Sequence, residues 1–417
     1  MDSTRSPTGS VRRHLPRRST RGPLDAADDP LSPLATSITV PSAAASTHSG
    51  ESASRLSLDT TIPDDPHPRF DLAFLQNPPN YLPIPTDDLP EPFLKSPNQP
   101  PDNAPLEDLL RRGLFRRAAQ KALFDLLQCA PTDAPRLFQL LYTRLACLVL
   151  IFRSDIATHE SIIIVDFLTK TPPDELVSVI PWELRLLLVR LHSIAAADGG
   201  RKGIMSLYAL AAEARQHIKA AQASNRDEEL KVWSVRLQDL GLRVADMLVE
   251  MGELETATRH LDTLTDVDTH ELAYRRALLQ LGSGDVAGAR TSIDQLPDSI
   301  AKGSLEAIFD TACGDYTKAI EQWQDCGEKS PTYALSTSNL AVGLLYTGRI
   351  AEAKHILESL AARVPAFPGM LFNLSTVYEL CTEQAVARKT ALVQSIATKD
   401  MTPDAGGWER PTFEFKL

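Results

Sequence analysis

Three short stretches of the sequence contain residue types that could carry out chemistry. The stretch "LGSGDVAG" (281–288) has the glycines of a phosphate-binding loop, and "CGDYTKAIEQW" (313–323) opens with a glycine and an acid. His159 and Glu160 have the side chains of an acid–base pair. A dinucleotide site needs a strand before its glycines, whereas the segment before 281–288, "ELAYRRALLQ", has helical spacing. We therefore interpret 281–288 as a turn and His159–Glu160 as a helix start.

The sequence has no other pattern typical of a catalytic or metal site. Its nine histidines form no H-E-x-x-H motif, and none stands at metal-ligand spacing from a cysteine. No G-x-S-x-G nucleophile elbow occurs. The five scattered cysteines form no C-x-x-C pair, which is typical of reduced thiols in a cytosolic protein. The sequence thus predicts no catalytic residue, no metal, no cofactor and no enzyme activity.

Composition narrows the class of protein further. The net charge of -11 argues against general nucleic-acid binding, which needs a basic surface. The longest apolar runs, such as "LACLVLIF" (145–152), fall short of the roughly 18 residues that a membrane span needs. No apolar stretch of the signal-peptide kind follows the basic N-terminus. We expect a soluble, cytoplasmic protein.

The chain changes character near residue 105, since 19 of its 30 prolines precede Leu106. Residues 1–67 are rich in Ser, Pro and Arg and lack periodic apolar positions, so we expect a disordered tail. That tail is either solvated or a phosphorylation-tuned contact with acidic lipid or protein. Residues 68–104 carry apolar side chains among prolines that forbid long helices. This strap either docks on the chain's own folded part or offers itself to a partner.

From Leu106 onwards the apolar spacing is helical almost throughout. We expect an N-terminal helical region at 105–232, an α-solenoid at 233–400 and a C-terminal tail at 401–417. The stretch "SIIIVDFL" (161–168) has the β-branched content of a strand. Because no partner strand lies nearby, we predict a buried helix there.

A repeat runs through the second half of the chain. Each unit has a glycine, an alanine five places later and a large residue four places after that. The four units are Gly252, Ala257 and Leu261, then Gly284, Ala289 and Ile293, then Gly314, Ala319 and Trp323, and finally Gly348, Ala353 and Leu357. A further alanine stands seven places before each glycine (Ala245, Ala277, Ala307, Ala341). The glycines are 32, 30 and 34 residues apart, a period typical of stacked helix pairs.

Each repeated residue type has a physical reason. Glycine accommodates the positive φ at which many helices end. The alanines on either side let two helices approach closely, and the large residue lies one turn on, on the same face. No single helix pair can bury its own apolar face, so such repeats are stable only as a stack.

This pattern resembles the tetratricopeptide repeat, most strongly from about 237 to 360. An outlying unit lies at 109–127, where Gly113 precedes Ala118 and Ala122. The resemblance implies an all-α fold, a tetratricopeptide-repeat-like α-solenoid preceded by the Pro-rich N-terminal region. Gly314 and Asp315 then belong to a bend between two helices.

The C-terminal third resembles a narrower family. The segments "SNLAVGLLYTGRIAEAKHILESL" (338–360) and "MLFNLSTVYELCTEQAVARKTALVQSIATK" (370–399) are followed by "TFEFKL". Their order is similar to the subunit 12 family of the transport protein particle (TRAPP) complex, in its fungal form. The resemblance implies a non-catalytic subunit of TRAPP III, a nucleotide-exchange complex for a Rab GTPase in early secretory traffic and autophagy. It implies other TRAPP subunits as partners and a peripheral location on Golgi or intermediate-compartment membranes.

Seven residues are candidates for partner binding: Asn339, Phe372, Asn373, Tyr378, Trp408, Phe413 and Phe415. The aromatic residues of the tail either bind a partner or cap the last helix of the chain itself. An alternative function is a co-chaperone adaptor that captures chaperone C-terminal carboxylates. Such a clamp needs several Lys, Arg and Asn side chains converging on consecutive helices, and Asn339 fits one such place in an incomplete set.

Overall fold

The computed structural model describes residues 71–87, 89–171, 179–195, 200–330, 334–400, 402, 415 and 416. These residues form helices and turns, and no strand occurs among them, which confirms the expected all-α fold. The predicted tail at 1–67 lies outside the described residues, as do Trp408 and Phe413.

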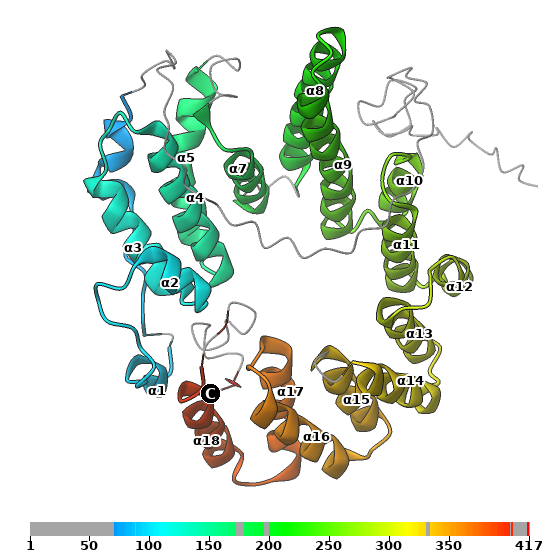
Figure 1. Cartoon of the computed structure of the whole chain (residues 1–417). Coiled ribbons are helices and arrows are strands. Elements are labelled where there is room, and N and C mark those ends of the chain that lie inside the picture. Colours follow the sequence, from blue (N-terminus) through cyan, green and yellow to red (C-terminus); the bar gives the residue numbers. More distant parts are fainter. Residues whose placement is uncertain are drawn as a thin grey trace, which may run out of the picture.

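The helices follow one another around a closed circuit, and α18 ends beside α1 (Figure 1). Two short 3₁₀ helices, η2 (Ala73–Gln76) and η3 (Pro78–Asn80), come first. The α-helices are α1 (Glu91–Leu94), α2 (Leu106–Arg111), α3 (Phe115–Gln128), α4 (Ala134–Leu150), α5 (Ser154–Lys170), α7 (Trp182–Ala195), α8 (Arg201–Ala223), α9 (Asp227–Glu250), α10 (Leu254–Thr263), α11 (Thr269–Ser283), α12 (Val286–Asp294), α13 (Ile300–Ala312), α14 (Tyr316–Lys329), α15 (Ala334–Tyr346), α16 (Ile350–Arg363), α17 (Pro368–Cys381) and α18 (Ala385–Ala397).

The four repeat glycines all lie at corners between paired helices. Gly252, Gly284, Gly314 and Gly348 separate α9 from α10, α11 from α12, α13 from α14 and α15 from α16, and their φ angles are 77°, 81°, 83° and 78°. Gly113, between α2 and α3, has a φ of 73°. A Cβ added at any of the four repeat glycines would meet nothing within 4 Å. The corners therefore require glycine for its backbone conformation and not for space.

The same backbone hydrogen bonds close each corner. The residue after the glycine donates its N–H to a carbonyl five residues back, as in Asp285 to Gln280 (2.8 Å) and Asp315 to Asp310 (2.9 Å). This is the Schellman arrangement, which satisfies carbonyls that a helix end leaves unpaired. At 281–288, the Asp285 carboxylate also accepts a hydrogen bond from the Gly288 N–H (2.9 Å) at the start of α12. The Asp285 carboxylate thus occupies the N-terminus of α12, which is where a phosphate group would have to bind.

The predicted alanines and large residues of the repeat are all buried between helices, whereas the four glycines themselves are exposed. The alanines that follow the corners are at most 1% exposed, and they are Ala257 on α10, Ala289 on α12, Ala319 on α14 and Ala353 on α16. The large residues one turn further on the same four helices are at most 4% exposed, and they are Leu261, Ile293, Trp323 and Leu357. The alanines before the corners are at most 3% exposed. None of these side chains is available to a partner, so their role in this structure is to pack the stack.

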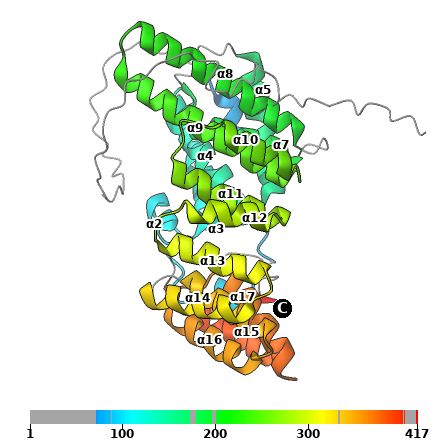
Figure 2. The ribbon, with the colours of Figure 1, turned by 90° about the vertical axis from the view of Figure 1, so that its right-hand side faces the viewer.

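The packed helix pairs form layers. Figure 2 shows the successive pairs from α9–α10 to α15–α16 stacked one upon the next. One apolar core joins α2–α5 and α7 to α13–α18, and a second core lies between α7 and α11. A smaller cluster between α11 and α13 includes Ile293 and Leu305.

Two local predictions differ from the structure in part. The segment 161–168 is helical, within α5, but only one edge of it is buried, since Ile162 is 59% exposed. The interpretation of His159–Glu160 as a helix start is wrong, because α5 begins at Ser154. Glu160 is 2% exposed and forms an ion pair described below.

Replacing Gly314 by alanine tests the role of the corner conformation. Because an L-residue is disfavoured at this φ, Gly314→Ala should lower the free energy of unfolding by about 1–2 kcal/mol. Gly327, within α14, is the matched control, since a Cβ there also meets nothing within 4 Å. Gly327→Ala should raise stability by roughly 0.5–1 kcal/mol. Urea unfolding followed by circular dichroism measures both, and equal effects at the two positions would contradict this explanation.

Candidate partner-binding surfaces

The strap at 68–104 docks on the chain's own helices over its described residues. Leu72, Leu75 and Phe93 are at most 2% exposed. The Gln76 amide donates to the carbonyl oxygens of Leu126 (2.8 Å) and Cys129 (2.5 Å) at the end of α3. These three apolar side chains are therefore used internally, whereas Leu82 and Leu94 of the strap stay 37% and 46% exposed.

A buried ion pair holds the middle of the strap. Arg144 on α4 donates to both carboxylate oxygens of Glu160 on α5, at 2.6 and 2.5 Å, and both side chains are at most 1% exposed. Glu160 accepts from the Leu82 N–H (3.0 Å), and Arg144 donates to the Leu82 carbonyl (3.0 Å). The ion pair thus satisfies both the N–H and the carbonyl of Leu82, which fixes the strap at this residue.

Burial also acts on the tyrosine beside this pair. The Arg144 guanidinium lies 5.5 Å from the centre of the Tyr81 ring, and the Tyr81 hydroxyl donates to the Leu75 carbonyl (2.5 Å). Burial, with a smaller effect from the Glu160 carboxylate, raises the pKa of Tyr81 above its usual value, against the effect of Arg144. The phenol therefore stays neutral and serves as a hydrogen-bond donor within the strap.

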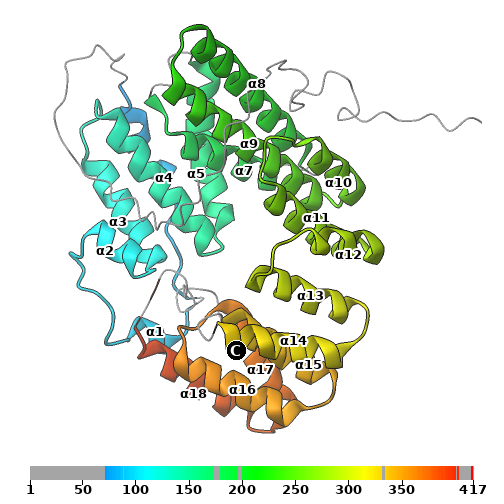
Figure 3. The ribbon, with the colours of Figure 1, turned by 45° about the vertical axis from the view of Figure 1, so that its right-hand side comes forward.

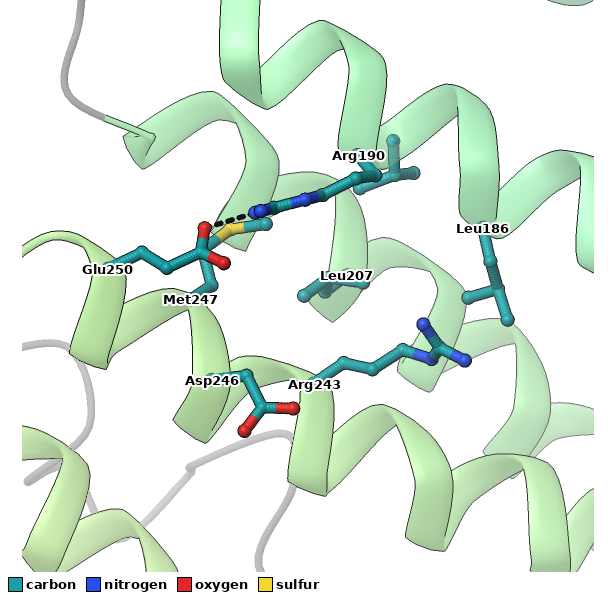
Figure 4. Close-up of a pocket in the computed structure, with 8 residues that line it drawn as sticks. Leu186, Arg190, Leu207, Arg243, Asp246, Met247 and Glu250 are labelled. Carbon is teal, nitrogen blue, oxygen red and sulfur yellow. Dashed lines mark hydrogen bonds and ion pairs between the residues drawn. The ribbon is translucent and has the colours of Figure 1, made fainter. Parts of the chain in front are cut away.

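Figure 4 shows a pocket of about 170 Å³ between α7, α8 and α9, lined by Leu186, Leu207 and Met247 among charged side chains. Arg190 pairs with Glu250 across the pocket. Arg243 pairs with Asp239 (2.7 Å), and Asp246 with Arg275 (2.7 Å). Since each charged lining residue already has a partner of opposite charge, the pocket offers no free acid or base from these residues.

A larger groove of about 660 Å³ lies between α9, α10 and α11. Val249 and Leu278 are 42% and 40% exposed in it, and Asp246, Glu271 and Arg275 stand among its polar residues. Burial raises the pKa of Asp246, and the Arg275 guanidinium opposes that change. The groove combines apolar lining residues with paired charges, which is more typical of a surface that binds a polypeptide than of an active site.

The cations that a co-chaperone clamp would use on α9 and α11 are already paired. Arg243 and Arg275 precede Gly252 and Gly284 by the same spacing as Asn339 precedes Gly348, and sequence reasoning missed them. Arg275 donates to Glu271 (2.6 Å) as well as to Asp246, and Arg243 donates to Asp239. Because intrachain carboxylates already occupy both guanidinium groups, this alternative function has no support from the described helices.

The predicted partner-binding residues fall into two groups. Phe372, 45% exposed on α17, and the half-buried Asn373 and Asn339 reach the surface. Tyr378 and Phe415 are buried, at 6% and 0% exposed, so their side chains are not available to a partner in this structure. Burial, followed by the effect of Glu358, raises the pKa of Tyr378 to about 12.

The end of the chain brings several of these residues together. The Lys416 ammonium lies 4.6 Å from the centre of the Phe372 ring, and Phe415 packs against Phe93 with ring centres 5.6 Å apart. Lys389 on α18 donates to the Lys416 carbonyl (2.6 Å), which ties the tail to that helix. Phe415 is therefore buried against α1, and Phe372 stays exposed beside it together with Lys416, on a surface that we call the C-terminal rim.

Two further features of the structure were not predicted. Tyr316 and Tyr346 stack in parallel beside successive corners, with ring centres 5.1 Å apart, and Tyr346 is 67% exposed. At the junction of α7 and α9, the Arg236 guanidinium lies 4.9 Å from the ring centre of Trp182 and 4.5 Å from that of Trp233. Burial lowers the pKa of Arg236. The position of both tyrosines next to a corner glycine was a signal for the first feature, whereas nothing in the spacing indicated the second.

Among the described residues, no group of three or more His, Cys, Asp or Glu side chains is arranged to hold a metal ion. Within the same residues, no helix has the length and apolar character needed to cross a membrane.

The fold and its surfaces define a class of protein, the stacked helix-pair repeat proteins. Among solved structures, the chain is similar to a tetratricopeptide repeat protein from Parabacteroides merdae ATCC 43184 (14% identity, 61% of this chain and 91% of that chain, TM-score 0.39). It is also similar to residues 1–338 of the assembly chaperone of RpL4 (16% identity, 68% and 96%, TM-score 0.28).

No family profile matches the chain. Its sequence is similar to mouse trafficking protein particle complex subunit 12, with 24% identity over 199 residues. The human protein of the same name is 23% identical over 230 residues. These matches cover 44% and 51% of this chain but only 25% and 29% of the relatives, so the chain corresponds to between a quarter and a third of their length.

Removing one member of the buried ion pair tests how the strap is held. Arg144→Met leaves the Glu160 carboxylate buried without a counterion, which should lower the free energy of unfolding by about 3–5 kcal/mol. The double variant Arg144→Met/Glu160→Met removes both charges and should cost clearly less. Guanidinium unfolding gives both values. A double variant as unstable as the single one would show that the uncompensated charge is not the cause.

Proposed function

We propose that this chain is a non-catalytic scaffold subunit of a TRAPP complex, of the TRAPP III type and in its fungal form. Its partners are the large peripheral subunits and the core of small subunits. The assembled complex, and not this chain, exchanges nucleotide on a Rab GTPase. Its setting is ER-to-Golgi vesicle transport and autophagy, with the chain cytoplasmic and peripheral on Golgi and ER–Golgi intermediate membranes.

The observation that carries the proposal is the similarity to trafficking protein particle complex subunit 12 over about half of the chain. A stack of helix pairs supports it, because such stacks present extended surfaces that hold other proteins. The paired charges of the pocket and groove also favour this role, since a reaction needs groups free to move protons. In the described part of the chain, every acidic or basic lining residue of the pocket in Figure 4 is already paired.

Phe372 is the residue that we assign to partner contact on the C-terminal rim. It is an exposed aromatic side chain on α17, and the Lys416 ammonium beside it adds a charge at the same place. Aromatic side chains are enriched at the centres of protein interfaces, which supports this assignment for Phe372. Tyr346, on the neighbouring α15, is a second exposed aromatic on this part of the stack.

Affinity purification of the tagged chain from its native cells tests the proposed function. We expect the other TRAPP subunits to be recovered with it in constant proportion. Recovery of the chain alone, as a monomer, would contradict the assignment.

A surface variant tests the assigned contact. Phe372→Asp should weaken recovery of the other subunits by about thirtyfold or more, since a dominant aromatic contact contributes at least about 2 kcal/mol. Ile162→Asp is the matched control, because Ile162 is 59% exposed on α5, in the N-terminal half of the chain. Retained assembly in both variants would remove Phe372 from the interface without affecting the assignment to the complex.

A further inference from the structure

The ring of helices closes where a short segment of the strap meets the last helix. Residues 93–98 comprise the end of α1 and the turn that follows it, and α1 lies beside α18 in both Figure 1 and Figure 3. Phe93 and Phe415 are both 0% exposed and pack against each other. The last part of the strap is thereby in direct contact with the C-terminal tail.

Hydrogen bonds from this segment end on the carbonyls of α18 and the turn after it. The Ser96 hydroxyl donates to the Ala397 carbonyl (2.5 Å). The Asn98 amide donates to the carbonyls of Thr398 (3.0 Å) and Lys399 (2.9 Å). The last carbonyls of a helix have no partner within the helix, so these two side chains cap α18 from 301 residues away.

The segment is held separately by the N-terminal helices. Arg112 donates to the Asn98 carbonyl (2.7 Å), and Arg117 to the Pro100 carbonyl (2.5 Å). The Gln99 amide donates to the Phe93 carbonyl (3.0 Å) and fixes the turn internally. These bonds do not involve α18, so the segment keeps its shape and its place on α2 and α3 when its contact with α18 is broken.

We propose that residues 93–98 form a releasable clasp, which holds the ring of helices closed and whose opening leaves both ends of the stack folded. The contact consists of the packing of α1 on α18 and of the Ser96 and Asn98 hydrogen bonds to the end of that helix, and the Phe93–Phe415 pair joins the segment to the tail. Water satisfies those carbonyls in the open form, as it does at free helix ends. The strap upstream is held by a buried ion pair, by contrast, and stays in place.

Opening changes what the chain presents. It uncovers the Phe93 and Phe415 rings and the end of α18, and it lets the distance between the first and last helices change. The clasp thus sets the span over which a partner on the C-terminal rim and one on the N-terminal helices are held. Clasp opening depends on intrachain contacts alone, whether or not the chain assembles into TRAPP.

Two substitutions in the full chain test the clasp. Ser96→Asp/Asn98→Asp places carboxylates against the negative end of α18, where anions are unfavourable. Ser96→Ala/Asn98→Ala is the milder variant, and losing the three side-chain hydrogen bonds to the end of α18 should shift the closed-to-open ratio by roughly a hundredfold. Lys95→Glu is the control. It makes the same charge change as the Asp pair in the same turn, but the Lys95 side chain is 75% exposed and pairs with Glu91.

Amide hydrogen exchange and small-angle X-ray scattering report the result. We expect both clasp variants to lose protection at α18 and to expand, with α3 and α4 still protected and Lys95→Glu unchanged. Protection lost together at α3, α4 and α18 would overturn the proposal, because the contact would then belong to one cooperative core. Unchanged protection at α18 and unchanged size in the Asp pair would overturn it as well.

Discussion

Close approach between neighbouring helices is the constraint on which the rest of the structure depends. It is set by alanines on both sides of each corner, which are almost fully buried. Each corner requires a residue in the left-handed backbone conformation, and glycine is present at all four corners. A larger side chain at Ala319 would push α13 and α14 apart and cost about 1–3 kcal/mol. Because each pair is stable only against its neighbours, such a displacement passes along the stack.

The strap converts an open stack of helix pairs into a closed ring. An open solenoid has two free ends, but here the strap covers α3–α5 and its last part reaches α18. The largest apolar core accordingly contains residues from both ends of the described chain. Burying one aromatic side chain contributes about 1.5–3 kcal/mol, so the Phe93–Phe415 contact is a substantial part of the closure. Phe372, which remains exposed, lies beside that closure on the C-terminal helices.

The parts of this fold that local physics determines could be predicted from the sequence. A positive φ at Gly284 depends on its immediate neighbours, and the spacing of Ala277 and Ala289 around it reports helix packing. Arg144 and Glu160 were missed because their pairing depends on how α4 and α5 lie, although an arginine within the apolar run of α4 was a usable signal. Contacts between distant segments, such as the bond from Ser96 to Ala397, leave no pattern in either segment that indicates the other. For the same reason Tyr378 was a candidate for partner binding, and the role of Phe415 was left open between a partner and the chain's own last helix, whereas both meet the chain's own core.

We propose that this stack of helices is a scaffold that binds other proteins. Crosslinking of the purified native assembly with a lysine-reactive reagent, read by mass spectrometry, tests that role most directly. Two lysines lie on the C-terminal helices and the tail: Lys354 is on α16, and Lys416 is beside Phe372. We expect crosslinks from Lys354 or Lys416 to other TRAPP subunits. Crosslinks confined to this chain, in a preparation where the other subunits crosslink to one another, would contradict that role.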